Sequence, residues 1–187
     1  MIIKTGRTGL AARAGHDLTI EITGWSARVI IPDDGVAAAK ITAELDLGSL
    51  AVREGTGGAK PLTDKDRGDI AKTARTILRQ PAASFTSTRV VPAGGSGGAI
   101  DGTLSLNGRS QPVRLQVTSP APGRYRGGTT VRQTDFVHAK SDACKSCTLD
   151  RICGGLFELG EHYDLGELYP VFVPAEDIVR KVMSDAE

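Results

Sequence analysis

The fold of this 187-residue chain is decided by residues 13–32, RAGHDLTIEITGWSARVIIP, and residues 41–69, ITAELDLGSLAVREGTGGAKPLTDKDRGD. At residues 18–23 and 41–47 of these stretches apolar and polar side chains alternate, as they do in a strand with one buried face and one wet face. The alternation changes phase near Gly24, which predicts a bend or bulge between two strands. We therefore expect half-buried strands, on which no acid, base or nucleophile stands out as catalytic.

One short amphipathic helix is expected after the loop at residues 48–61. Thr63 offers an oxygen-bearing cap, and acidic residues follow it in the first turn. The apolar residues of this helix fall on one stripe before a proline, namely Ile70, Ala74, Ile77 and Leu78.

Strand patterns resume at residues 84–91 and continue over residues 99–118, where the Asn107-Gly108 pair marks a tight hairpin. A last strand is predicted over residues 128–136. Sequential hairpins around one helix predict an antiparallel sheet that closes on itself into a barrel.

The composition is that of an ordinary globular protein, with 40% hydrophobic and 24% charged residues. A net charge of +1 gives no electrostatic case for a nucleic-acid partner. No stretch reaches the roughly 18 apolar residues of a membrane span, and the N-terminus lacks the apolar core of a signal peptide. Three clustered cysteines, an odd number, do not form a secreted disulfide framework. We therefore expect a cytoplasmic protein without a membrane span.

Several stretches together resemble the YceI-like family. They are GRTGLAARAGHDLTIEITGW at residues 6–25, LDLGSLAVREGTGGAKPLTDKDR at 45–67, the helix that ends before Pro81, FTSTRVV at 85–91, and DGTLSLNGRSQPVRLQV at 101–117. The resemblance covers roughly residues 5–136. It implies a mostly β fold, an antiparallel lipocalin-like β-barrel with a hydrophobic lumen.

The resemblance also implies a function, since several family members are similar to isoprenoid carriers. It favours non-enzymatic binding of a small apolar partner, a long isoprenoid- or lipid-like molecule, in the barrel lumen. The candidate lumen residues come from the alternation alone, and a solidly packed core without a cavity would show the same pattern. These candidates are Leu18, Ile20, Ile22, Ile41, Ala43, Leu45, Leu104 and Leu106.

After Phe136 the family pattern fails, which predicts a barrel domain at residues 1–136 and a small α-helical or irregular tail at residues 137–187. The tail resembles the C-terminal cysteine segment of radical-SAM proteins with SPASM or twitch extensions, which carry C-x2-C-x5-C-x3-C. The first three positions of that motif are Cys144, Cys147 and Cys153, and the fourth is Phe157. The radical-SAM core motif is absent from the sequence.

Closely spaced thiolates suit a soft metal centre, but three are too few for a closed zinc site or a fully cysteine-ligated cluster. His138 and His162 are candidate fourth ligands. The alternative function is therefore a metal- or Fe-S-binding accessory module, and the resemblance favours an iron–sulfur cluster over zinc. A third hypothesis is a barrel left open by a missing closing strand, with an aggregation-prone edge. The sequence does not indicate an oligomeric state.

Overall fold

The computed structural model describes residues 1–6, 15–58, 60–94, 97–121, 123–139, 141–150, 153, 156–157 and 169–184. Its strands and α-helices are β1 (Ile2–Lys4), β2 (Asp17–Ile22), β3 (Trp25–Ile30), β4 (Lys40–Asp46), β5 (Leu50–Thr56), α1 (Asp64–Ile77), β6 (Ala82–Pro92), β7 (Gly97–Leu106), β8 (Arg109–Ala121), β9 (Arg124–Gly128), β10 (His138–Ala139), β11 (Leu156–Phe157) and α2 (Glu176–Ser184). The chain divides into two compact units. The first comprises Met1, Ile22–Leu50 and Leu78–Phe136, and the second comprises Ile2–Glu21, Ala51–Ile77 and Val137–Glu187.

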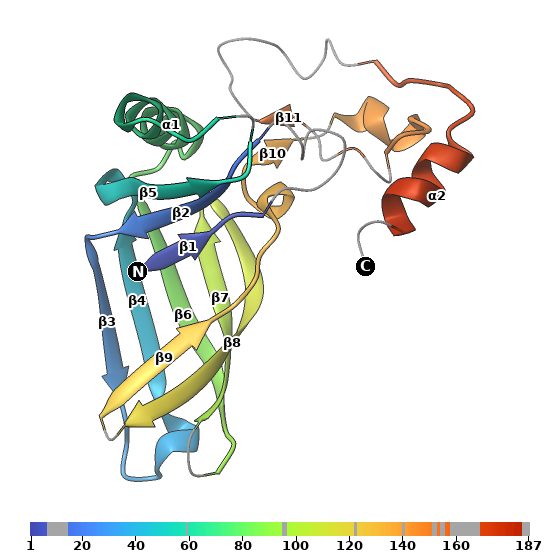
Figure 1. The fold of residues 1–187 in the computed structure, drawn as a ribbon. Coiled ribbons are helices and arrows are strands. Elements are labelled where there is room, and N and C mark those ends of the chain that lie inside the picture. Colours follow the sequence, from blue (N-terminus) through green and yellow to red (C-terminus); the bar gives the residue numbers. More distant parts are fainter. Residues whose placement is uncertain are drawn as a thin grey trace. The chain divides into compact units, whose positions relative to one another are not determined.

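The first unit is built on a six-stranded antiparallel sheet in the order β3-β4-β6-β7-β8-β9. Figure 1 shows these strands curving into a half-barrel, with β9 and β8 turned back across the sheet. The predicted fold class, mostly β and antiparallel, is confirmed. The predicted boundary between residues 136 and 137 stays a prediction.

Two local predictions hold in this unit. At Gly24 the chain leaves β2 and begins β3, and a Cβ on this glycine would lie 3.1 Å from the Cβ of Asp46. The Asn107-Gly108 hairpin joins β7 to β8 with positive φ angles of 55° and 75°, as the mirror-image two-residue turns require. The Asn107 side chain also accepts the N–H of Arg79 and donates to the carbonyl of Phe136, at 3.0 and 3.3 Å.

The predicted strand over residues 128–136 is wrong. The last strand of the sheet, β9, already ends at Gly128, and a 3₁₀ turn spans Gln133–Asp135. In that turn the Arg132 carbonyl accepts the N–H of Asp135 at 3.1 Å. Phe136, which follows the turn, is only 1% exposed. The segment thus combines a turn with a buried ring at its end, and its weak alternation does not produce an extended strand.

The second unit contains a three-stranded sheet in the order β1-β2-β5. Strand β1 was not predicted, because three residues are too few to show a period of two. Ile20 and Val52 are buried in β2 and β5, and Glu21 pairs with Arg53 at 2.7 Å on the same two strands. Gly55 allows a close approach of side chains, since a Cβ there would lie 2.2 Å from Leu62 Cδ1.

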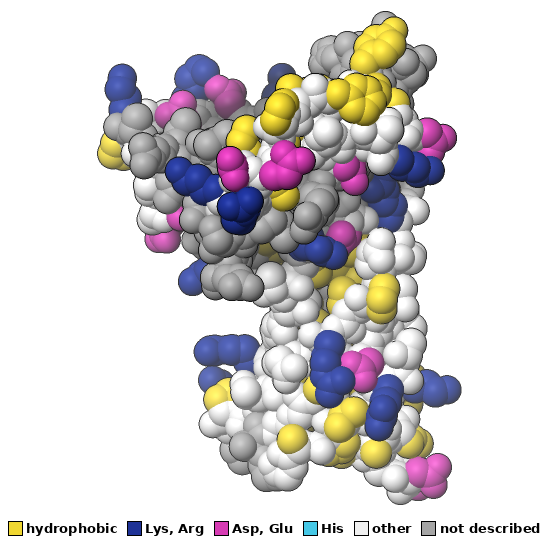
Figure 2. Space-filling view, turned by 90° about the vertical axis from the view of Figure 1, so that its right-hand side faces the viewer, with side chains coloured by type: hydrophobic (Ala, Val, Ile, Leu, Met, Phe, Trp, Pro, Cys, Tyr) yellow, Lys and Arg dark blue, Asp and Glu magenta, His cyan; other side chains and the backbone are white. Residues whose placement is uncertain are grey.

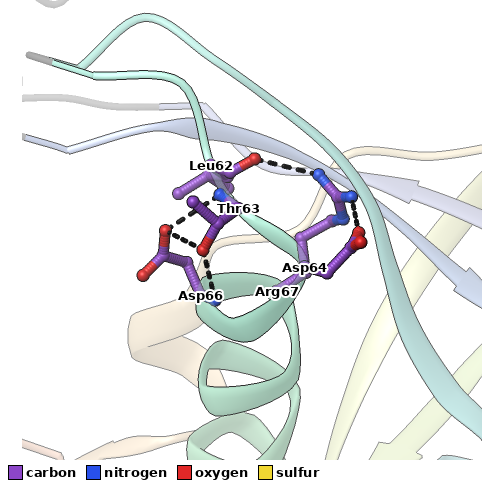
Figure 3. A network of polar contacts seen from close by, with 5 residues as sticks. All are labelled: Leu62, Thr63, Asp64, Asp66 and Arg67. Atoms are coloured by element: carbon purple, nitrogen blue, oxygen red, sulfur yellow. Dashed lines mark hydrogen bonds and ion pairs between the residues drawn. The ribbon is translucent and has the colours of Figure 1, made fainter.

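Helix α1 begins with the predicted cap. The Thr63 hydroxyl accepts the backbone N–H of Asp66 at 3.2 Å, and the Asp66 carboxylate accepts the hydroxyl and the N–H of Thr63 at 2.7 and 2.9 Å (Figure 3). This reciprocal arrangement satisfies donors that a helix start leaves unpaired. The Arg67 guanidinium donates to the carbonyl of Leu62 at 3.0 Å and pairs with Asp64.

The pKa of the Asp66 carboxyl lies below its usual value. The hydrogen bond from the Thr63 hydroxyl is the main cause, and the hydrogen bond from the Thr63 N–H is the second. A group whose pKa is lower in the folded state binds fewer protons there than in the unfolded chain. Its contribution to stability is therefore present above the usual carboxyl pKa and is lost as the pH falls through the folded value.

Replacing Thr63 by alanine is expected to lower the free energy of unfolding by about 1 kcal/mol, because the N-cap oxygen is removed. The matched control is Thr76→Ala in the same helix, whose hydroxyl only bonds back to the Lys72 carbonyl at 3.2 Å. Urea unfolding followed by circular dichroism measures both changes. Equal losses in the two variants would contradict the role given to the cap.

The second unit also contains the short pair β10-β11, a 3₁₀ turn at Asp142–Ser146, and α2. Thr148 ties the segment ahead of α2 to this turn. Its N–H and its hydroxyl both donate to the carbonyl of Val171 at 3.0 Å, and its hydroxyl accepts the N–H of Val173 at 3.1 Å. None of the helices that the structure describes is long and apolar enough to cross a bilayer.

Candidate functional site

One face of the six-stranded sheet is apolar across all six strands, and we call it the inner face. Residues directly opposite in paired strands point to the same side of a sheet. The pairings Ala27↔Ala43, Ala43↔Phe85 and Phe85↔Leu104 therefore carry one row of apolar side chains from β3 to β7. A β-bulge between Ser87 and Arg89 shifts the register of β6. After it Val90 pairs with Ile100, so Val90 lies on the same face as Phe85.

Register and alternation together define the members of the inner face. Its apolar side chains are Trp25, Ala27, Val29, Ile41, Ala43, Leu45, Ala83, Phe85, Val90, Pro92, Ile100, Leu104, Leu106, Val113, Leu115, Val117 and Tyr125. Its polar members are Ser87, Arg109 and Gln111. Three glycines also lie on this face, namely Gly98, Gly102 and Gly127.

The inner face is the concave side of the half-barrel. Along β4 and β8 its side chains are half-buried, while those of the opposite face are exposed. Side chains crowd together on the concave side of a curved sheet, so the less exposed face is the concave one. Most of these side chains remain half-buried and are not sealed in a core. Trp25 on the edge strand β3 is 54% exposed.

Phe85 packs directly against Gly102 on this face. A Cβ built on Gly102 would lie 2.4 Å from Cζ of Phe85 and 2.6 Å from the carbonyl oxygen of Thr86. The ring therefore lies over the bare backbone of the neighbouring strand, and Phe85 is only 6% exposed. Phe85 and Ala83, which is 5% exposed, are therefore the buried residues of a face whose other apolar side chains are half-buried or exposed.

The opposite face of the sheet is polar. Thr42, Glu44, Ser84 and Thr86 alternate with the inner-face residues of β4 and β6, and Arg114 on β8 pairs with Asp101 on β7 at 3.1 Å. Figure 2 shows basic and acidic side chains interspersed over the surface, with hydrophobic side chains between them. A sheet with one apolar and one polar face is suited to enclosing an apolar molecule on one side only.

A hollow of about 320 Å³ lies beside β8, where β9 does not extend. Gln111 and Val113 of the inner face line it, together with residues 129–132 and Phe136. The turn that replaces the predicted last strand therefore lies along the edge of β8.

Of the eight lumen residues predicted from the sequence, five lie on the inner face: Ile41, Ala43, Leu45, Leu104 and Leu106. The other three, Leu18, Ile20 and Ile22, lie on β2 in the smaller sheet. Ile20 and Ile22 are buried there, and Ile22 is fully inaccessible. Ligand contact by any of the eight residues stays a prediction.

The sequence reasoning left out several residues of the inner face. Trp25, Val29, Phe85 and Leu115 have the same period of two as the predicted set. Alternation alone would have included them. The special contact between Phe85 and Gly102 has no local sequence signal, because it depends on the register between two strands.

His16 has a structural contact. Its Nε2 donates to the carbonyl of Lys60 at 2.7 Å, across the loop after β5. A Cβ on Gly58 would lie 2.4 Å from that nitrogen, and Gly58 has a φ of +70°. The ring therefore holds this loop against the start of β2.

Cys144 and Cys147 lie in the 3₁₀ turn at Asp142–Ser146 and at its C-cap, while Cys153 is exposed. Within the part of the chain that the structure describes, no three His, Cys, Asp or Glu side chains gather closely enough to hold a metal. The side chain of His138 and all of His162 lie outside the described residues. Metal or cluster binding by Cys144, Cys147 and Cys153 stays a prediction.

Comparisons with known proteins agree with this architecture. The family model for the YceI-like domain matches residues 4–152. A comparison with curated proteins gives no match. Among solved structures, the crystal structure of Burkholderia cenocepacia BcnA is 23% identical with a TM-score of 0.48, over 63% of this chain and 71% of that one.

Two mutants of CJ YCEI protein are similar as well. One, made for nanotechnology applications, is 13% identical with a TM-score of 0.41, over 63% of this chain and 61% of that one. The other, with a monobromobimane guest structure, is 13% identical with a TM-score of 0.43, over 72% and 76% of the two chains.

Proposed function

The chain belongs to the YceI-like family, whose members are generally non-catalytic binding proteins, and from this premise we propose that it binds one long apolar molecule of isoprenoid or lipid type. The binding surface is the inner face of the six-stranded sheet. The observation that carries the proposal is that this face is apolar across six strands, while most of its side chains are only half-buried. A sealed core would leave no apolar surface for a ligand to cover.

Burial of apolar surface supplies the affinity. Each methylene moved from water into apolar contact contributes roughly 0.8 kcal/mol. Affinity should therefore rise with each isoprene unit added to the ligand, until the ligand covers the face. The polar members Arg109 and Gln111 lie toward one end of β8. A single polar head group on the ligand fits that end, with the apolar chain along β7 and β4.

Trp25 reports binding directly, because it is the only tryptophan of the chain and lies on the inner face. Titration of the full chain with farnesol is expected to shift its emission to shorter wavelength, since the indole leaves water. Geraniol, one isoprene unit shorter, should produce the same shift at higher concentration. An emission spectrum that neither alcohol changes, or equal apparent affinities for both, would contradict the proposal.

A further inference from the structure

We propose that Cys144 and Cys147 form a reversible thiol–disulfide pair. Its redox state determines whether the Cys147 sulfur holds the segment around Val171, ahead of α2. The two residues are three apart, and Cys144 lies inside the 3₁₀ turn at Asp142–Ser146. The N–H of Cys147 donates to the carbonyl of Cys144 at 3.0 Å, which closes the last step of the turn. In a 3₁₀ turn the side chains of residues three apart are eclipsed. Cys147 is the C-cap of this turn, and its φ of −75° is close to that of the turn, so the Cβ atoms of the two cysteines start on the same side of it.

The turn also sets a suitable separation between the two residues. A chain segment closed by this i to i+3 hydrogen bond keeps its end Cα atoms less than about 7 Å apart. Disulfides usually join Cα atoms about 4.4–6.8 Å apart. Cys153 lies beyond this turn, and its N–H donates to the carbonyl of Leu149 at 2.9 Å in a separate local contact. The structure thus favours Cys144 and Cys147 as the bonding pair.

Both sulfur atoms are in reach of hydrogen-bonding groups. Cys144 and Cys147 are both partly exposed residues. The Cys144 sulfur lies 3.6 Å from the Ser141 hydroxyl. The Cys147 sulfur accepts the backbone N–H of Val171 at 3.4 Å. The second contact joins a thiol to a segment 24 residues further along the chain.

Oxidation would change that contact. A bond to Cys144 fixes the Cys147 sulfur toward the turn, so the N–H of Val171 loses its partner. Thr148, next to Cys147, holds the carbonyl of Val171 and the N–H of Val173. Helix α2 follows directly, anchored by the buried Ala175 and Val179. Oxidation of the pair therefore removes a hydrogen bond that holds the segment ahead of α2. This effect requires no ligand on the inner face.

The reaction requires a disulfide as the oxidant, for which we name the glutathione class. One protein thiolate attacks the oxidant disulfide, forms a mixed disulfide and releases one glutathione thiolate. The second protein thiolate attacks the protein sulfur of that mixed disulfide and releases the second glutathione. The two cysteines lose two electrons, the oxidant gains them, and the protons of the protein thiols end on the released thiols.

The test treats the full chain with glutathione disulfide and maps cross-links by peptide mass spectrometry. We expect a Cys144–Cys147 cross-link in the parent chain and in Cys153→Ser, the matched control. Cys144→Ser and Cys147→Ser should each lose it. An absence of any cross-link, or a main cross-link through Cys153, would overturn the proposal. Zinc protection of all three thiols from alkylation would overturn it in favour of a metal site.

Hydrogen exchange then tests the coupling to α2. Oxidation is expected to speed exchange at the Val171 amide and in residues 176–184 of the parent chain and of Cys153→Ser. The same treatment of Cys144→Ser should leave exchange in these residues unchanged, because the Cys144–Cys147 disulfide cannot form. A mapped Cys144–Cys147 disulfide without any change in exchange would overturn the control of α2.

Discussion

Phe85→Ala is expected to lower the free energy of unfolding of the first unit by about 3–5 kcal/mol, the usual cost of removing a buried aromatic ring. Phe85 is 6% exposed at the centre of the sheet, and its ring covers the backbone at Gly102. The neighbouring strands β4 and β7 cannot move in to fill the cavity, because each is also hydrogen-bonded to a further strand, β3 or β8. Urea unfolding followed by the emission of Trp25, which lies in the same unit, measures the loss.

The matched control is Phe172→Ala, which makes the same chemical change at a side chain that is 69% exposed. Surface substitutions of this kind usually change stability by less than about 0.5 kcal/mol. Similar small losses of unfolding free energy in both variants would show that Phe85 is not tightly packed on the inner face.

Ala43→Asp is expected to weaken binding of a prenyl alcohol by roughly 1–3 kcal/mol, the cost of placing a polar group against an apolar surface. That corresponds to a loss of about tenfold to hundredfold in affinity. Ala43 is half-buried on the inner face, between Ala27 and Phe85. The loss should shrink at acid pH, where the introduced carboxyl is protonated and neutral.

Thr42→Asp provides the control, since Thr42 is the next residue of the same strand and faces the opposite side. It adds the same charge at an exposed position, so it should leave affinity unchanged. Circular dichroism of both variants checks that the sheet is retained. Equal affinity losses from Ala43→Asp and Thr42→Asp would contradict the assignment of the inner face as the binding surface.

Much of the sheet could be predicted from the sequence, because a period of two records which side chains share a face. Ile41, Ala43 and Leu45 were assigned to one face in this way, and their pairings place them there. The same period in β2 was assigned to the same lumen, but β2 belongs to the smaller sheet. Alternation shows that a strand has one buried face, while the sheet it joins depends on partners distant in the chain.

The remaining differences also arise from contacts at long range. The segment before Phe136 forms a 3₁₀ turn in place of a strand, and the ring that follows the turn is buried. The close contact of Phe85 with Gly102 follows from register, which no single strand encodes. In the tail, the spacing of Cys144 and Cys147 was evident, but the 3₁₀ turn that ends at Cys147 was not.

The position of a bound apolar ligand decides whether the inner face is the binding surface. Photolabelling of the full chain with a farnesol analogue that carries a diazirine, followed by peptide mapping, tests this most directly. We expect labels on residues 25–29, 41–45 and 100–106, all removed by excess farnesol and weakened by Ala43→Asp. Labels confined to β2 or to residues 137–184, or labelling that excess farnesol does not reduce, would contradict it.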